Sequence, residues 1–324
     1  MSKSVTLASI QDTSRSGNYR EAEVMLRGFL SSLFPLSIAS VEVRPDTLSL
    51  NSVNGFVHLS VPDARTGASK LFFKFHHEEN EEGLKEYYNS QLLSGNGFPV
   101  EMPVYASHEV GKQVLLYPFK AAERMADVCK RLDGLKKPDA LMQDVLKAQE
   151  KLDTLCCERY LATLHQAPLA KLADEPVLQL FHHRLVDDKN TPQGGLGGRY
   201  TQFYAQKIFE LPGKNVIRYE DLAAFHWRIN GIEYKDTLAE AFVKALAIVS
   251  PAAHGVNYAA VVAHGDAHNG NVWFNAGKPP ALSLFDPAFA GPHIPALLAE
   301  ISRRFTISLH TRSGFMILRK RMPG

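Results

Sequence analysis

A series of short β-type runs in the first third of the chain constrains the fold more than any other pattern. These runs are rich in β-branched and aromatic residues, and turn residues such as Asn, Gly, Asp and Pro separate them. They occupy residues 41–50, 55–61, 70–76, 102–110 and 112–119. Because such runs are typical of an antiparallel meander, we expect a sheet of about five strands within residues 1–119.

Two segments in the same region have the helical period instead. In residues 18–34, Met25, Phe29 and Leu33 recur every four positions, which predicts an amphipathic helix that ends before Pro35 and covers the sheet. Residues 78–97 predict a helix inserted between strands. The acids in its first turn are favourable to the helix dipole.

Beyond residue 119 the pattern becomes mainly helical. Residues 142–168 and 238–251 are periodic runs, and each closes at a proline. Residues 191–200 contain four glycines within five positions, which we interpret as a loop. The sequence therefore predicts an α+β protein, with an N-terminal sheet and a mainly helical remainder.

Composition and charge exclude several classes of function. The chain has 324 residues with a net charge of +2, but six cations and no acid follow Glu300, which leaves 30 cations against 34 acids in the first 300 residues. A mildly acidic body is unlike a nucleic-acid-binding surface. The chain has three cysteines, and its start and interior have no apolar run of membrane or signal-peptide length. We expect a cytoplasmic protein without nucleic-acid or membrane partners, and the sequence does not indicate its oligomeric state.

A polar turn between two apolar stretches carries the candidate chemistry. The stretch VVAHGDAHNGNVWFN, residues 261–275, follows the pattern H-x-D-x-x-x-x-N, and Asp286 comes 15 residues after Asn271. Residues 271–275 and 282–286 flank a short turn, as in a β-hairpin. Phosphoryl transfer needs a carboxylate near the attacking hydroxyl and ligands for Mg²⁺. Since Mg²⁺ prefers oxygen ligands and keeps several waters, a carboxylate and an amide suffice.

This combination of motifs resembles the aminoglycoside phosphotransferase and choline kinase family, small-molecule kinases with a fold like that of protein kinases. The resemblance spans roughly residues 18–300 and implies two lobes: an N-terminal antiparallel sheet lobe, residues 1–119, and a mainly helical lobe, residues 120–324. The implied reaction transfers the γ-phosphoryl group of ATP, with Mg²⁺, to a hydroxyl of a small molecule. A sugar, an amino alcohol, an aminoglycoside or a thiamine-like compound could be the acceptor.

The resemblance also implies roles for residues of the polar turn. Asp266 would be the catalytic base, and Asn271 and Asp286 would bind the metal. His264 would brace the loop and His268 would help to position it.

In the first lobe, the resemblance implies contacts to the nucleotide. Strand alternation puts Leu71, Phe73 and Phe75 on one face of their strand and Lys74 on the other. Lys74 would contact the phosphates and pair with Glu86, or with Glu82 one turn earlier.

Two further segments of this lobe are candidates for nucleotide binding. Ser52, Asn54 and Gly55, in an expected turn over residues 50–56, would cradle the phosphates, although a plain hairpin turn is an alternative. Backbone groups near Leu116, Tyr117 and Pro118 would meet adenine.

Two departures from the family pattern leave other functions open. Pro287 and Ala288 follow Asp286, so the second acid that many relatives carry after the metal-binding aspartate is absent. The last 24 residues are basic and suggest an aberrant or incomplete C-terminal end, as a frameshift near residue 301 would produce. The alternatives are a catalytically inactive, truncated kinase-like remnant and a nucleotide-binding protein. A third alternative is a metal-dependent hydrolase that uses His264, Asp266 and His268 as metal ligands. For the basic C-terminal residues, the alternative explanation is a polybasic tail.

Overall fold

The structure is a computed structural model, and it describes residues 5–44, 52–75, 82–133, 140–178, 185–186, 196–211, 215–249 and 257–299. It divides into two compact units. Unit 1 consists of Met1–Ala162, Asp266–Ala288 and Ile301–Gly324, and unit 2 of Thr163–Gly265 and Phe289–Glu300. Each unit is described by itself below, and the lobe boundary after residue 119 stays a prediction. The basic C-terminal segment from residue 300 lies outside the described residues.

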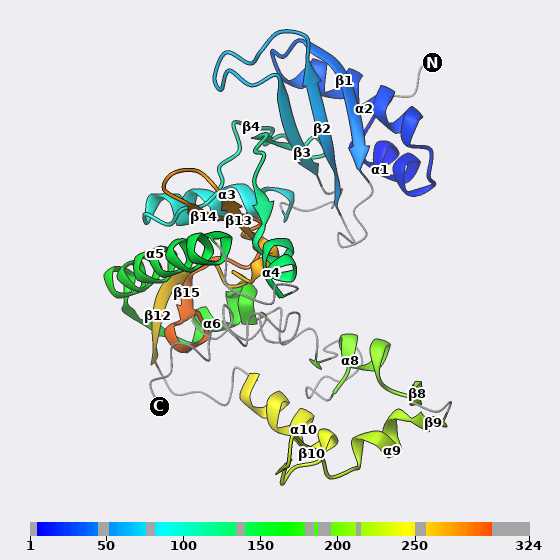
Figure 1. The fold of residues 1–324 in the computed structure, drawn as a ribbon. Coiled ribbons are helices and arrows are strands. Elements are labelled where there is room, and N and C mark those ends of the chain that lie inside the picture. The colour runs from blue at the N-terminus through cyan, green and yellow to red at the C-terminus, as the bar shows by residue number, and fades with distance from the viewer. Residues whose placement is uncertain are drawn as a thin grey trace. The chain divides into compact units, whose positions relative to one another are not determined.

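A five-stranded antiparallel sheet dominates the first part of unit 1 (Figure 1). Its strands are β1 (Ile38–Arg44), β2 (Val53–Leu59), β3 (Lys70–Phe75), β4 (Tyr105–Ala106) and β5 (Leu115–Pro118). The predicted antiparallel sheet is thus confirmed, but the order is β1-β2-β3-β5-β4. A simple meander would have put β4 beside β3. The inserted helix α3 (Glu82–Gly95) carries the chain past that position, so β5 pairs with β3.

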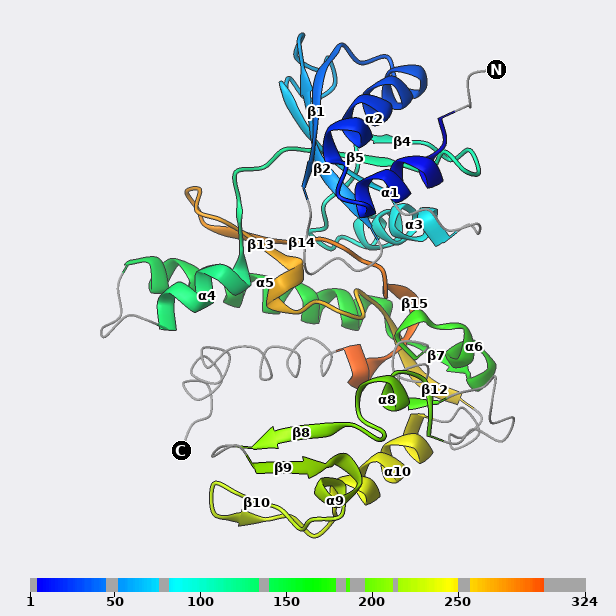
Figure 2. The ribbon, with the colours of Figure 1, turned by 90° about the vertical axis from the view of Figure 1, so that its right-hand side faces the viewer.

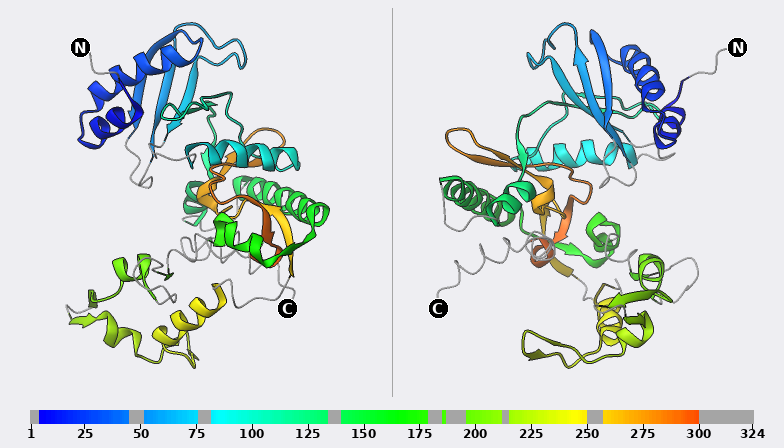
Figure 3. Two further views of the ribbon diagram at one scale, coloured as in Figure 1. Left: turned by 180° about the vertical axis from the view of Figure 1, so that it is seen from behind. Right: turned by 45° about the vertical axis from the view of Figure 1, so that its right-hand side comes forward.

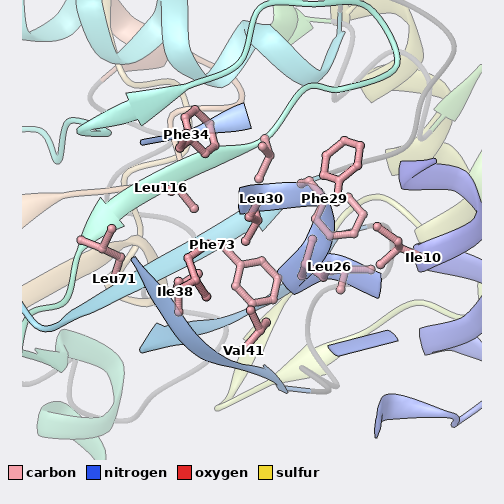
Figure 4. Close-up of a cluster of buried hydrophobic side chains, with 14 of the residues drawn as sticks. Ile10, Leu26, Phe29, Leu30, Phe34, Ile38, Val41, Leu71, Phe73 and Leu116 are labelled. Atoms are coloured by element: carbon pink, nitrogen blue, oxygen red, sulfur yellow. The ribbon is translucent and has the colours of Figure 1, made fainter. Parts of the chain in front are cut away.

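Two helices cover one face of this sheet. These are α1 (Leu7–Arg15) and α2 (Tyr19–Leu33), and Figures 2 and 3 show both on the same side of the strands. The helix predicted for residues 18–34 is confirmed, whereas α1 was not predicted. Leu26 and Leu30 of α2 pack with Val41 and Phe73 of the sheet in the buried cluster of Figure 4.

Strand alternation decides which residues of β3 enter this core. Leu71, Phe73 and Phe75 are 0 to 2% exposed, while Phe72 and Lys74 are partly exposed on the opposite face, as predicted. Gly55 lies inside β2 rather than in a turn. A Cβ there would overlap the Glu42 carbonyl oxygen and the ring of Phe73, so close packing explains this glycine.

The rest of unit 1 joins helices to a hairpin. The helices are α3, α4 (Met125–Asp133) and α5 (Ala140–Thr163), and the last confirms most of the run predicted from residue 142. Strands β13 (Val272–Asn275) and β14 (Ala281–Leu284) form the predicted hairpin, with Val272 opposite Leu284, and β6 (Glu123–Arg124) pairs with β13. The single turn η2 (Asn269–Asn271) leads into this hairpin.

Unit 2 mixes helices with strands that the sequence did not predict. Strand β12 (Asn257–Ala263) lies between β7 (His165–Pro168) and β15 (Gly291–Pro295). Two-stranded ribbons pair β8 (Ile208–Leu211) with β9 (Asn215–Arg218), side by side in Figure 2, and β10 (Arg228–Ile229) with β11 (Ile232–Glu233). The helices are α6 (Leu169–Asp174), α8 (Gly198–Phe203), α9 (Tyr219–Ala223) and α10 (Leu238–Val249), and α10 confirms the run predicted from residue 238. Within the described ranges, no helix is long and apolar enough to cross a bilayer.

Candidate active site

One lysine lies against two carboxylates from distant parts of unit 1. Lys74 on β3 has its Nζ 2.8 Å from Oε2 of Glu86 on α3 and 2.7 Å from Oδ1 of Asp286, which follows β14. The Lys74 and Glu86 side chains are only 14% and 10% exposed, and that of Asp286 is 39% exposed. Sequence reasoning left the partner of Lys74 open between Glu86 and Glu82. The geometry selects Glu86, and the Glu82 side chain lies outside the described residues.

The two carboxylates keep the lysine charged. Burial alone would lower the pKa of Lys74, but the nearby charges of Glu86 and Asp286, with their hydrogen bonds, outweigh burial and raise this pKa above its ordinary value. With both carboxylates ionised, the three groups carry a net charge of −1. This cluster therefore attracts a cation, and its ammonium group can also contact an anion.

Tyr117 on β5 completes the hydrogen bonding of Glu86. Its OH donates to Glu86 Oε1 over 2.7 Å, so one oxygen of Glu86 accepts from Tyr117 and the other faces Lys74. Burial, and then the negative charge of Glu86, raise the pKa of Tyr117 well above its ordinary value, which keeps the phenol protonated as a donor. Sequence reasoning assigned Tyr117 to nucleotide binding through its backbone and missed this side-chain contact.

Leu116, the neighbouring candidate, lies on the other face of β5. It is fully buried, and its carbonyl oxygen accepts from the backbone N–H of Val104. Its contact with adenine stays a prediction.

Asp286 has an uncommon backbone conformation that neighbouring groups hold in place. Its φ is 55°, in the left-handed region that few residues other than glycine adopt, although Asp is among the more tolerant. The carbonyl of Pro287 accepts from Asn89 Nδ2 over 2.8 Å, and Phe285 donates its N–H to the Asn271 carbonyl. The Phe285 ring also stacks on Trp273, with centroids 4.3 Å apart. Strained conformations of this kind are often found at functional sites.

The loop from Asp266 to Asn271 is tied together by its own polar groups. The carbonyl of Asp266 accepts from Asn271 Nδ2 over 3.0 Å and from the His268 N–H over 2.9 Å. Nδ1 of His268 accepts from the Gly270 N–H, so in the neutral ring the proton is on Nε2, which lies 3.8 Å from Oδ2 of Asp266. Asn269 donates to Cys129 Sγ on α4 over 3.4 Å and fixes the loop to that helix.

The other sequence candidates lie in three places. Asn54 on β2 lies directly opposite Lys74 in the strand register, so the two side chains are on the same face of the sheet. Ser52 precedes β2 by one residue. His264 belongs to unit 2, where it follows β12 and is 1% exposed. The proposed roles of Ser52, Asn54, Gly55 and His264 in phosphate binding and loop bracing stay predictions.

The hydrolase alternative expects His264, Asp266 and His268 to act together as metal ligands. Within the described ranges, no group of three or more His, Cys, Asp and Glu side chains comes together to hold a metal ion.

Unit 2 contains a separate buried carboxyl that the sequence analysis did not single out. Glu175 is 3% exposed; its Oε1 accepts from the His293 N–H over 3.0 Å, and its Oε2 has no hydrogen-bond partner among the described residues. Burial raises the pKa of Glu175 to about 7, despite the His293 N–H, which lowers it. Gly291 leaves the space for this carboxyl, because a Cβ there would overlap Oε2. His165 Nε2 lies 2.9 Å from His293 Nδ1 beside it.

Comparisons with known proteins add little to this geometry. No family model matches the sequence, and no curated protein matches it. Among solved structures, the chain is similar to one titled "Macrolide 2'-phosphotransferase type I", with 11% sequence identity, a TM-score of 0.46, and coverage of 92% of this chain and 80% of that chain. A similarity of this extent carries no argument about fold or function.

We predict that Lys74→Met lowers the free energy of unfolding by roughly 2–4 kcal/mol, because it leaves two carboxylates close together without their cation. Lys112→Met is the matched control, since Lys112 pairs with Glu109 on the surface, and it should change stability by less than about 0.5 kcal/mol. Urea unfolding at neutral pH measures both. Equal effects of the two substitutions would show that the Lys74 contacts do not stabilise the fold.

We predict that Glu175→Gln removes a pH dependence of stability. The folded state holds a proton on Glu175 that the unfolded state releases near pH 4.5, so the contribution of Glu175 to stability falls as pH rises from about 4.5 to about 7, by up to about 3 kcal/mol. Urea unfolding across this range should show a smaller fall in the variant. The control Glu233→Gln, at an exposed position on β11, should follow the wild type. Parallel curves for wild type and Glu175→Gln would contradict the assignment.

Proposed function

We propose that this chain is an ATP-dependent phosphotransferase that moves the γ-phosphoryl group of ATP to a hydroxyl of a small molecule. The observation that carries the proposal is the contact of Lys74 with both Glu86 and Asp286. In protein kinases, a strand lysine paired with a helix glutamate, together with a metal-binding aspartate, must be in place for phosphoryl transfer. The same three side-chain types come here from a strand, a helix and the end of a hairpin.

The residues present fit a magnesium ion. Asp286 supplies a carboxylate, and the Asn271 amide donates through Nδ2 to the Asp266 carbonyl, which orients its oxygen as the remaining acceptor. The segments that carry these two residues are joined by the Phe285 N–H and the Asn271 carbonyl. Hard oxygen ligands of this kind suit Mg²⁺, which would neutralise charge on the phosphates when bound.

The chain's own residues divide the remaining work between binding and proton transfer. Lys74 binds a phosphate oxygen, and Glu86, itself fixed by Tyr117, keeps the ammonium group in position. Asp266 has a partly exposed carboxylate on a loop braced by Asn271 and His268. It accepts the proton of the acceptor hydroxyl while the acceptor oxygen bonds to the γ-phosphorus. The bond from that phosphorus to the β,γ-bridging oxygen breaks, and ADP leaves.

The acceptor is a small compound with a free hydroxyl, for which a sugar, an amino alcohol, an aminoglycoside and a thiamine-like compound are the candidates. A nucleotide-binding protein that transfers no phosphate would use the same contacts to Lys74. Measuring turnover therefore distinguishes a phosphotransferase from a nucleotide-binding protein, whereas measuring ATP binding does not.

We predict that Asp266→Asn lowers turnover at least about 100-fold and leaves ATP binding within about twofold of the wild type, because the amide cannot accept the hydroxyl proton. ADP formation with a panel of hydroxyl compounds measures turnover, and calorimetry measures binding. Asp236→Asn, at a surface ion pair with Lys244, is the control and should leave both unchanged. A wild type that binds ATP but turns over no member of the panel would favour the nucleotide-binding reading. Unchanged turnover in Asp266→Asn would remove Asp266 from the role of base.

A further inference from the structure

A glutamate that follows α6 binds the backbone of a neighbouring strand in unit 2. Strand β15 is at one end of the order β15-β12-β7, and α6 packs against β15 and β7 (Figure 2). The His293 N–H of β15 donates to Glu175 Oε1 over 3.0 Å, and the His293 carbonyl accepts from Tyr258 OH over 2.7 Å. Because an edge strand presents unpaired backbone groups, contacts of this kind hold the strand to the rest of its unit.

The Glu175 carboxyl occupies a slot that Gly291 keeps open. A Cβ at Gly291 would overlap Glu175 Oε2, so a larger residue there would displace the carboxyl. Glu175 is 3% exposed, and Oε2 has no hydrogen-bond partner in the part of the chain that the structure describes. A buried carboxylate oxygen without a donor is costly, whereas a protonated carboxyl has no charge to solvate. The slot therefore suits the protonated form of Glu175 better than the ionised form.

The charged and titratable groups that face Glu175 come from all the elements packed around it. They are Lys171 and Asp174 on α6, His165 on β7, His293 on β15 and Tyr258 on β12. Burial is the largest influence on the pKa of Glu175 and raises it to about 7, although the His293 N–H lowers it. The charge of Asp174 raises this pKa further, and charges on His165 and Lys171 lower it. Burial raises the pKa of Tyr258 to about 12, so its phenol stays protonated at neutral pH.

The histidine on β15 acts on stability in the opposite direction to Glu175. The Thr163 carbonyl accepts from His165 Nδ1 over 2.8 Å, so Nε2 of the neutral His165 ring accepts from His293 Nδ1 over 2.9 Å. Burial, and then the charge of His165, lower the pKa of His293. A lowered histidine pKa costs stability as pH falls, whereas a raised carboxyl pKa costs stability as pH rises. The direction of a pH effect therefore identifies which group causes it.

We propose that Glu175, Gly291 and His293 form a pH-operated latch between α6 and β15. With a proton on Oε2, the carboxyl of Glu175 stays in its slot beside Gly291 and holds the His293 N–H. Without that proton, the buried charge favours water, so the carboxylate leaves the slot more often and the His293 N–H loses its acceptor. The inference does not depend on the proposed function, because all three residues belong to unit 2 and the phosphate and metal contacts belong to unit 1.

Hydrogen exchange of single amides in the full chain, followed by NMR at pH 5 and pH 8, tests the latch. The protection factor of the His293 N–H, corrected for the intrinsic exchange rate at each pH, should fall at least about tenfold from pH 5 to pH 8. Low concentrations of urea should leave it unchanged, because opening the latch exposes little surface. Glu175→Gln should lose the pH dependence. Glu233→Gln, the same change at an exposed position on β11, is the matched control and should follow the wild type.

Three results in the wild type alone would overturn the latch, so the test does not depend on the folding of Glu175→Gln. The first is a His293 protection factor that is constant with pH. The second is a protection factor that rises with pH, which would assign the effect to a histidine. The third is a protection factor that falls with urea as steeply as the free energy of global unfolding, since the amide would then exchange only when the whole chain unfolds. A pH dependence that persists in Glu175→Gln would overturn the role of Glu175.

Discussion

The contact of one ammonium group with two carboxylates unites the site in unit 1. Lys74 joins the central strand of the sheet to helix α3 through Glu86 and to the end of the β13–β14 hairpin through Asp286. Because Lys74 and Glu86 are largely buried, each needs the opposite charge of the other, and the more exposed Asp286 adds a second carboxylate to the ammonium group. Backbone contacts reinforce the arrangement, since Leu284 of β14 exchanges hydrogen bonds with residues 99–101, which follow α3. Helix, strand and hairpin are therefore positioned together.

Local sequence patterns were sufficient to predict the strand that carries Lys74, the helix that carries Glu86 and the face on which Lys74 lies. The alternation in β3 placed Lys74 opposite Phe73, and the helical period after residue 78 placed Glu86 on the helix that follows. Both predictions depend only on neighbouring residues. Helix α1 was not predicted because polar Gln11 and Ser14 lie on its buried face and interrupt the apolar period.

Contacts between distant segments could not be predicted in this way. The hydrogen bond from Tyr117 to Glu86 depends on β5 lying beside β3, whereas a meander would have placed β4 there. Gly55 was expected in a turn, but it lies in a strand where the Phe73 ring on the adjacent strand leaves no room for a side chain. The hydrogen bond from Asn89 to the Pro287 carbonyl, next to the positive φ of Asp286, likewise joins segments that lie far apart in sequence. Sequence alone indicated the candidate residues, and the strand order determines what they contact.

The central claim is that Lys74, Glu86 and Asp286 form a site for a metal-bound nucleoside triphosphate. Thermal unfolding of the full chain with and without Mg²⁺ and ATP, for the wild type and for Asp286→Ala, tests it most directly. A ligand at 100 times its dissociation constant stabilises the folded state by about 2.7 kcal/mol, which is readily measured. We expect the wild type to be stabilised by ATP only when Mg²⁺ is present, and the variant not to be stabilised. A cooperative unfolding transition that Mg²⁺ and ATP leave unchanged in the wild type, or that they shift equally in Asp286→Ala, would contradict the account.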